Sequence, residues 1–268
     1  MTAINQSINQ YEPSFGKEEA DALHDYIMQG GWITEFRKTA ELEKRLAEFI
    51  NAEYCIMVNN GTISLSLLAM AAGISAGDEV LVPNYTMIAT PNSLRLFGAK
   101  PVFVDVEPET LCMDIQKAET ALTERTKGIM LVTANGRYPK AGIDRFVDFS
   151  IKHNLVLLED AAQSLGSFFP DGRHMGTVGA GGSFSFSMPK VISTGQGGCI
   201  VTNNNKLAER IRKMKDFGRD KGGLDIHDQL GWNFKFTDIQ AVVGLCQMDK
   251  LQERLIRKKV FTEGSKIL

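Results

Sequence analysis

The sequence has no run of apolar residues that approaches the roughly 20 needed to cross a bilayer, and its first residues lack the basic and apolar segments of a signal peptide. It also has no excess of basic charge, because 30 Lys and Arg residues face 32 Asp and Glu residues, for a net charge of −2. This balance argues against a surface for nucleic acid or anionic lipid. We expect a cytoplasmic protein that binds neither nucleic acid nor membrane.

Cysteine and histidine are scarce, with four residues of each. The cysteines are far apart and fall mostly within apolar segments, which is typical of reduced core residues rather than of disulfides. The histidines show no close pairing of the kind that binds zinc. No metal site is expected from these residues, which are Cys55, Cys112, Cys199, Cys246, His24, His153, His174 and His227.

What the sequence does contain is a regular alternation of short apolar segments with segments of helical spacing. This pattern is typical of an α/β fold, in which a mostly parallel sheet is covered by helices on both faces. About seven strands are expected, at 54–58, 79–82, 101–105, 128–133, 154–159, 183–187 and 199–202. Amphipathic helices are expected at 18–29 and 38–51, and one long helix runs from Thr237 to about residue 259.

Lys190 follows the sixth of these strands, in the stretch GSFSFSMPKVISTGQGG. The alternation of phenylalanine and serine indicates a half-buried strand, and it ends at Met188 and Pro189. A lysine between a proline and several glycines is well placed to be held in one position and approached closely by a flat ligand. Taken alone, the stretch favours the simpler interpretation of an exposed loop lysine, and the rest of the chain shifts the balance.

Three other strand ends carry polar residues, and parallel sheets bind ligands at the carboxyl ends of their strands. Residues 59–62 (NNGT) offer helix amides to a phosphate, or form an ordinary turn capped by Thr62. Asp160 ends a very apolar strand, where it caps a helix or pairs with a protonated ring nitrogen. Residues 231–238 (GWNFKFTD) form either a capped loop, with Thr237 or Asp238 as the cap, or the edge of a cleft.

An amine, a carboxylate and phosphate donors at successive strand ends are the groups that pyridoxal 5'-phosphate requires. The amine forms an imine with the cofactor's aldehyde, the carboxylate pairs with the pyridine nitrogen, and the helix amides hold the phosphate. Other phosphorylated ligands could use the same groups.

Taken in order, these stretches resemble the DegT/DnrJ/EryC1/StrS family of pyridoxal-phosphate-dependent sugar aminotransferases. The resemblance runs from about residue 10 to residue 260 and rests on GGWIT (30–34), NNGT (59–62), VPNYTMIATPNS (82–93), LLEDAAQSLG (157–166), GSFSFSMPKVISTGQGG (182–198) and GWNFKFTDIQAVVGL (231–245). It implies a fold type I, aspartate-aminotransferase-like large domain with a seven-stranded, mainly parallel sheet.

The resemblance also implies a role for three residues around the cofactor ring. Lys190 would form the imine with the cofactor and carry protons during catalysis. Asp160 would pair with the pyridine nitrogen, and Gln163 would contact the side of the ring that bears the hydroxyl group.

By the same resemblance, the amides of Gly61 and Thr62 and the hydroxyl of Ser185 would hold the phosphate. Asn233 would reach the cofactor of a neighbouring subunit, since active sites of this family lie at a dimer interface. Lys235 is the alternative for that contact. A homodimer with shared active sites is therefore expected.

The sequence departs from the family at two places near the expected site. Many members have an aromatic residue that stacks on the cofactor ring where this chain has Met87, so either Met87 or Tyr85 is expected to pack there. Residues 132–137 (VTANGR) stand where many members read VHLYG, close to the substrate. Family chains also continue into a smaller domain, so residues 1–250 are expected to form the cofactor-binding domain and residues 251–268 the start of a link.

The function implied is transfer of an amino group, with L-glutamate as the expected donor, to a keto sugar linked to a nucleotide, such as a 4-keto-6-deoxy sugar, in biosynthesis of surface polysaccharide or secondary metabolites. Alternatives are a non-nucleotide ketone as acceptor, or a truncated, non-catalytic protein that binds the cofactor. A sugar 3-dehydratase is disfavoured because those relatives carry histidine where this chain has Lys190.

Overall fold

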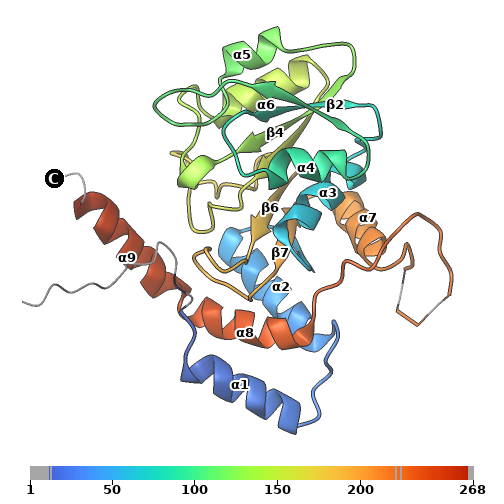
Figure 1. The fold of residues 1–268 in the computed structure, drawn as a ribbon, viewed down its shortest axis with the longest axis vertical. Coiled ribbons are helices and arrows are strands. Elements are labelled where there is room, and N and C mark those ends of the chain that lie inside the picture. Colours follow the sequence, from blue (N-terminus) through green and yellow to red (C-terminus); the bar gives the residue numbers. More distant parts are fainter. Residues whose placement is uncertain (1–11, 13, 221, 224, 265–268) are drawn as a thin grey trace, which may run out of the picture.

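The computed structural model describes residues 12, 14–220, 222–223 and 225–264 of the chain. Within them, seven strands form one sheet in the order β1-β7-β6-β5-β4-β2-β3 (Figure 1). β7 is antiparallel to both of its neighbours, and all other pairs are parallel. The strands are β1 (Tyr54–Val58), β2 (Glu79–Pro83), β3 (Lys100–Val104), β4 (Thr126–Val132), β5 (Val156–Asp160), β6 (Gly181–Ser185) and β7 (Gly198–Thr202).

Helices cover both faces of the sheet, because alternate residues of these apolar strands point to opposite faces. On one face the core is closed by α3 (Gly61–Ala71), α4 (Ala89–Arg95) and α7 (Asn205–Lys215). On the other face, α2 (Arg37–Ile50) and α8 (Asp238–Asp249) cover β1, β6 and β7. On that same face, α5 (Ile115–Thr120) and α6 (Ile143–Lys152) cover β5, β4, β2 and β3. The predicted α/β architecture is confirmed.

Each of the seven predicted strands overlaps an observed one, and the first two predicted helices correspond to α1 (Lys17–Met28) and α2. The prediction of one long helix after Thr237 is wrong. α8 ends at Asp249, and a separate helix, α9 (Leu251–Gly264), follows and projects away from the sheet (Figure 1). At the junction, the Lys250 N–H donates to the carbonyl of Gln247 at 3.2 Å. The Lys250 side chain forms an ion pair with Glu19 of α1 at 2.7 Å, so the break lies beside α1.

The cysteines are free, as expected, with Cys55, Cys112 and Cys199 buried and Cys246 half-buried. Among the described residues, no helix combines the length and the apolar character needed to cross a membrane.

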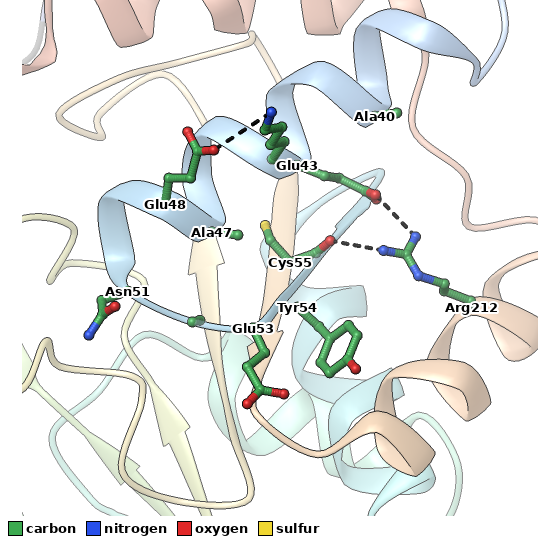
Figure 2. Close-up of a pocket in the computed structure, with 11 residues that line it drawn as sticks. Ala40, Glu43, Ala47, Glu48, Asn51, Glu53, Tyr54, Cys55 and Arg212 are labelled. Atoms are coloured by element: carbon green, nitrogen blue, oxygen red, sulfur yellow. Dashed lines mark hydrogen bonds and ion pairs between the residues drawn. The ribbon is translucent and has the colours of Figure 1, made fainter.

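β1 is an edge strand whose outer backbone groups are bound by side chains. The N–H of Met57 donates to Glu43 at 2.8 Å, and its carbonyl accepts from Lys215 at 2.9 Å. Arg212 donates to the carbonyl of Cys55 at 3.3 Å. These bonds protect an edge that would otherwise offer a template to another strand. A cavity of about 510 Å³ lies beside them, between α2, the amino end of β1 and Arg212 (Figure 2). It is at the opposite end of the strands from Lys190.

Candidate active site

Asp160 is the last residue of β5 and is only 5% exposed. One carboxylate oxygen accepts the Thr90 hydroxyl at 2.7 Å, and the other accepts the Ala162 N–H at 3.2 Å. No helix begins at Asp160, so the helix-cap interpretation is excluded. Burial raises the pKa of this carboxyl, while the bonds from Thr90 and Ala162 and the charge of Lys190 act in the opposite direction. A buried carboxylate with few donors is suited to a cationic partner.

Lys190 lies in the segment between β6 and β7, and its backbone N–H donates to the carbonyl of Ser187 at 3.1 Å. The side chain is half-buried. Burial lowers the pKa of the amine; the charge of Asp160 opposes this shift, and that of Lys258 on α9 adds to it. The neutral, nucleophilic amine is therefore more populated than that of an exposed lysine. The structure brings together the predicted amine and carboxylate.

The start of α3 lies directly against β6. An added Cβ at Gly61 would stand 2.9 Å from the Cβ and 3.1 Å from the Oγ of Ser185, so the two backbones approach as closely as glycine allows. The first amides of a helix have no partner inside it and attract anions. The helix cap is Asn60, whose side chain accepts the Ile63 N–H at 2.9 Å, so the alternative of Thr62 as the cap is wrong. Gly61 thus lies against Ser185, and Thr62 is the next residue of α3.

Gln163 is exposed, and its side-chain oxygen accepts the N–H of Asn135 at 2.7 Å. Asn135 has a left-handed backbone (φ 54°). Gln163 therefore anchors the 132–137 segment, whose sequence departs from the family pattern. Met87 and Tyr85 are 68% and 50% exposed, so both side chains are accessible after β2.

Asn233 is not brought together with Lys190 in this chain. It is exposed, and its backbone forms an isolated bridge with that of Asp216. Lys235 forms an ion pair with Asp216 at 2.5 Å and lies over the Phe217 ring at 4.4 Å from its centroid. Because Lys235 is held by these two contacts, Asn233 is the better candidate for a contact outside this protomer.

Two important side chains were missed by the sequence reasoning. Glu159 is fully buried and accepts the N–H groups of Gly176, Val178 and Gly179 at 2.7–2.8 Å, so it anchors the segment before β6. Thr90 orients Asp160; the only signal was its place within the 82–93 motif.

Asp238 was predicted as a possible cap for its own helix, a role that Thr237 fills by accepting the Gln240 N–H at 3.3 Å. Asp238 instead accepts the N–H groups of Phe36, Lys38 and Thr39 at 2.8–2.9 Å. It therefore caps α2, about 200 residues away in the sequence.

The site residues fit pyridoxal phosphate on three structural grounds. A buried carboxylate and a half-buried amine interact electrostatically, the amino end of α3 is available to a phosphate, and a glycine allows close approach there. Within the described residues, no group of three or more His, Cys, Asp or Glu side chains could hold a metal ion.

Comparison with known proteins gives relatives whose names refer to nucleotide sugars. The chain is 38% identical to a GDP-perosamine synthase from Caulobacter vibrioides, with 88% of this chain and 64% of that protein aligned. It is 37% identical to a UDP-2-acetamido-2-deoxy-3-oxo-D-glucuronate aminotransferase from Pseudomonas aeruginosa, covering 92% of this chain and 68% of that protein. The chain thus spans about two thirds of the length of these relatives.

Among solved structures, S. venezuelae DesV in complex with a ketimine intermediate superimposes with a TM-score of 0.82 at 29% identity, covering 88% of this chain and 62% of that one. The fold is therefore that of fold type I aminotransferases. The model of the DegT/DnrJ/EryC1/StrS aminotransferase family matches residues 13–264, and the chain belongs to that family.

Proposed function

We propose that this chain binds pyridoxal 5'-phosphate and transfers an amino group, with L-glutamate as donor, to a keto sugar carried on a nucleotide. Aminotransferases of this family depend on that cofactor. The named relatives act in GDP-sugar and UDP-sugar chemistry, which supports the substrate class. The observation that carries the proposal is the convergence of Lys190 and Asp160 beside the amino end of α3.

In this function Asp160 holds a proton on the ring nitrogen of the cofactor. The Thr90 hydroxyl, 2.7 Å away, fixes the orientation of the carboxylate. A cationic ring beside Asp160 compensates its burial, which otherwise raises its pKa. Bound pyridoxal phosphate supplies an aldehyde that condenses with amines and a ring that withdraws electrons from the reacting carbon.

Lys190 is the amine that holds the cofactor, and once released it moves a proton to and from the reacting carbon. This role needs an amine that is partly neutral near pH 7, and burial lowers its pKa in that direction. Gly61 and Thr62 donate their amides to the phosphate, and Ser185 donates its hydroxyl. Gln163 is proposed to contact the ring from the side of the 132–137 segment, which it already anchors through Asn135.

The proposed active unit is a homodimer, in which Asn233 of one protomer reaches the cofactor of the other. In support, the segments at 32–33 and 85–88 expose large apolar side chains, and contiguous exposed apolar surface marks interaction sites. These side chains are Trp32, Ile33, Tyr85, Met87 and Ile88, each at least 50% exposed. Met87 is proposed to pack on the cofactor ring. Residues 1–250 are proposed as the cofactor-binding domain, with residues 251–268 beginning the link to a further domain.

The test uses absorbance. The wild-type protein with pyridoxal phosphate should develop the near-visible band of a lysine imine, and L-glutamate should bleach it. Lys190→Ala should lose the band and keep the circular dichroism spectrum of the folded protein. Nucleotide-linked 4-keto and 3-keto sugars are then offered to the aminated cofactor form. An unchanged band and turnover in Lys190→Ala would exclude the assignment.

A further inference from the structure

A network of polar side chains connects α1, α8 and α9 to the segment that carries Lys190. Arg254 of α9 donates through Nη1 to the carbonyl of Val191 at 2.9 Å, one residue beyond Lys190. The N–H of Ser193 donates to the side-chain oxygen of Gln247 at 3.3 Å. Two backbone groups within three residues after the proposed catalytic lysine are therefore bound by side chains of the carboxyl-terminal helices.

These two side chains are themselves fixed. Arg254 Nη1 also donates to the side-chain oxygen of Gln247 at 2.6 Å. Gln247 is 1% exposed, and its amide nitrogen donates to Glu19 at 2.7 Å and to the Ser14 carbonyl at 3.0 Å. Glu19 is 3% exposed and lies on α1, which packs against α8 (Figure 1). A buried amide with every bond made has one stable orientation.

The charge of the network is balanced within it. Burial acts to raise the pKa of Glu19, but hydrogen bonds from Lys250, Gly16 and Gln247 outweigh it and hold that pKa at about 2. Glu19 is therefore ionised at any physiological pH. Its negative charge stabilises the cation of the half-buried Arg254, whose pKa is lowered by burial.

We propose that Arg254 and Gln247 are positioning residues for Lys190, and that Glu19 orients them. They hold residues 191–193 against α8 and α9, and so keep the Lys190 amine where the charge of Asp160 acts on it. The segment is also bound at its two ends, because the Thr194 N–H donates to the carbonyl of Phe186 at 2.9 Å. The Arg254 and Gln247 bonds hold the stretch between these points, and losing them frees the backbone from the Val191 carbonyl to the Ser193 N–H. This inference rests on the proposed function only through the role given to Lys190.

The experiment compares Arg254→Met with Arg257→Met, a control on the same helix. The side chain of Arg257 is 71% exposed, and its ion pair is with Glu253 of the same helix. Amide hydrogen exchange of the peptide covering residues 188–194 is measured in the protein without added cofactor. Arg254→Met should exchange about fivefold to tenfold faster there, the factor expected for one lost hydrogen bond, and Arg257→Met should match the wild type.

The second readout is the pH profile of the rate at which pyridoxal phosphate forms the near-visible band. Asp160, from β5, and Lys258, from α9, are the charges that act on the Lys190 amine. Loosening the segment admits water, so the midpoint in Arg254→Met should move up, toward that of an exposed lysine. Arg254→Lys, which keeps the charge but not the fork of donors, should shift in the same direction, and it decides the question if Arg254→Met does not fold.

A folded Arg254→Met with wild-type exchange and a wild-type midpoint overturns the inference, as does an equal shift in Arg257→Met. If the wild type forms no band that depends on Lys190, the proposed function fails instead. The exchange measurement then still decides whether Arg254 holds the segment.

Discussion

The change Asp238→Ala should destabilise the protein far more than its place at the start of α8 suggests. The carboxylate is fully buried and accepts five hydrogen bonds, from the backbone of Phe36, Lys38 and Thr39 and from the hydroxyls of Thr39 and Tyr26. Loss of a helix cap costs about 1 kcal/mol. Thr39 is only 1% exposed, so its amide and hydroxyl are left without water, at about 1 kcal/mol or more each. We expect a loss of about 3 kcal/mol.

The measurement is urea denaturation followed by tryptophan fluorescence, at fixed protein concentration and without cofactor. The matched control is Thr237→Ala, the neighbouring residue that caps α8 through one N–H at 3.3 Å. Its loss should be about 0.5–1 kcal/mol. Asp238→Asn, which keeps one acceptor oxygen, should fall between the two.

The pH dependence of this difference is a further check. Burial acts to raise the pKa of Asp238. The hydrogen bonds from the amides of Lys38 and Thr39 and from the Thr39 hydroxyl outweigh this effect, so the net shift of the pKa is downward. A carboxylate with a lowered pKa stabilises the fold above its unfolded pKa of about 4, and that contribution is lost as the pH falls through the folded value. The gap between wild type and Asp238→Ala should therefore shrink below about pH 4. A loss of under about 1 kcal/mol at pH 7, or one no larger than that of Thr237→Ala, would refute this account.

Three other changes test the site and its support. Thr90→Val removes the hydroxyl that donates to Asp160; it should weaken pyridoxal phosphate binding about tenfold, and an unchanged dissociation constant in an absorbance titration would contradict the role of Thr90. Gly61→Ala places a methyl group 2.9 Å from the Cβ of Ser185; it should weaken phosphate binding, measured by competition with inorganic phosphate, while Gly222→Ala serves as the control, because Gly222 has open space around it and no positive φ. Glu19→Gln should lower the free energy of unfolding by about 1–3 kcal/mol at neutral pH, as measured by urea denaturation. The wild type has this extra stability above pH 4.5 and loses it as the pH falls toward 2. Plots of stability against pH that run parallel for the two proteins would contradict a stabilising role of the Glu19 charge.

The strands were predictable because each is a short apolar segment bounded by turn residues, which is the pattern of a sheet buried on both faces. Their ends were less predictable. Residues 183–187 read as a strand by alternation, but β6 spans Gly181–Ser185 because its partners are set by register, with Gly182 opposite Val201 and Ser185 opposite Gly198. Pairing decides where a strand begins and ends, and pairing is not visible in one segment.

The cap of α2 and the break at Lys250 could not be predicted, for the same physical reason. Nothing near Phe36 in the sequence caps α2, since the acceptor is Asp238. No proline or glycine marks Lys250 as a helix end; its partner is Glu19, on a helix more than 200 residues earlier. Residues that act through distant partners carry no local pattern, whereas the turn residues around Lys190 indicate by themselves that it lies in a segment between two strands, as it does between β6 and β7.

Glu159 and Asp160 show why the type of a residue and its position in the sequence do not by themselves assign its role. They are adjacent on β5, so their side chains point to opposite faces of the sheet, and burial raises the pKa of both carboxyls. The oxygens of Glu159 receive three backbone amides, which commits them to the segment 176–179. Asp160 receives one hydroxyl and one amide and faces the charge of Lys190. A carboxylate has about four acceptor positions, so Asp160 keeps capacity for a cationic N–H donor, and this capacity supports the proposal that Asp160 rather than Glu159 serves the cofactor.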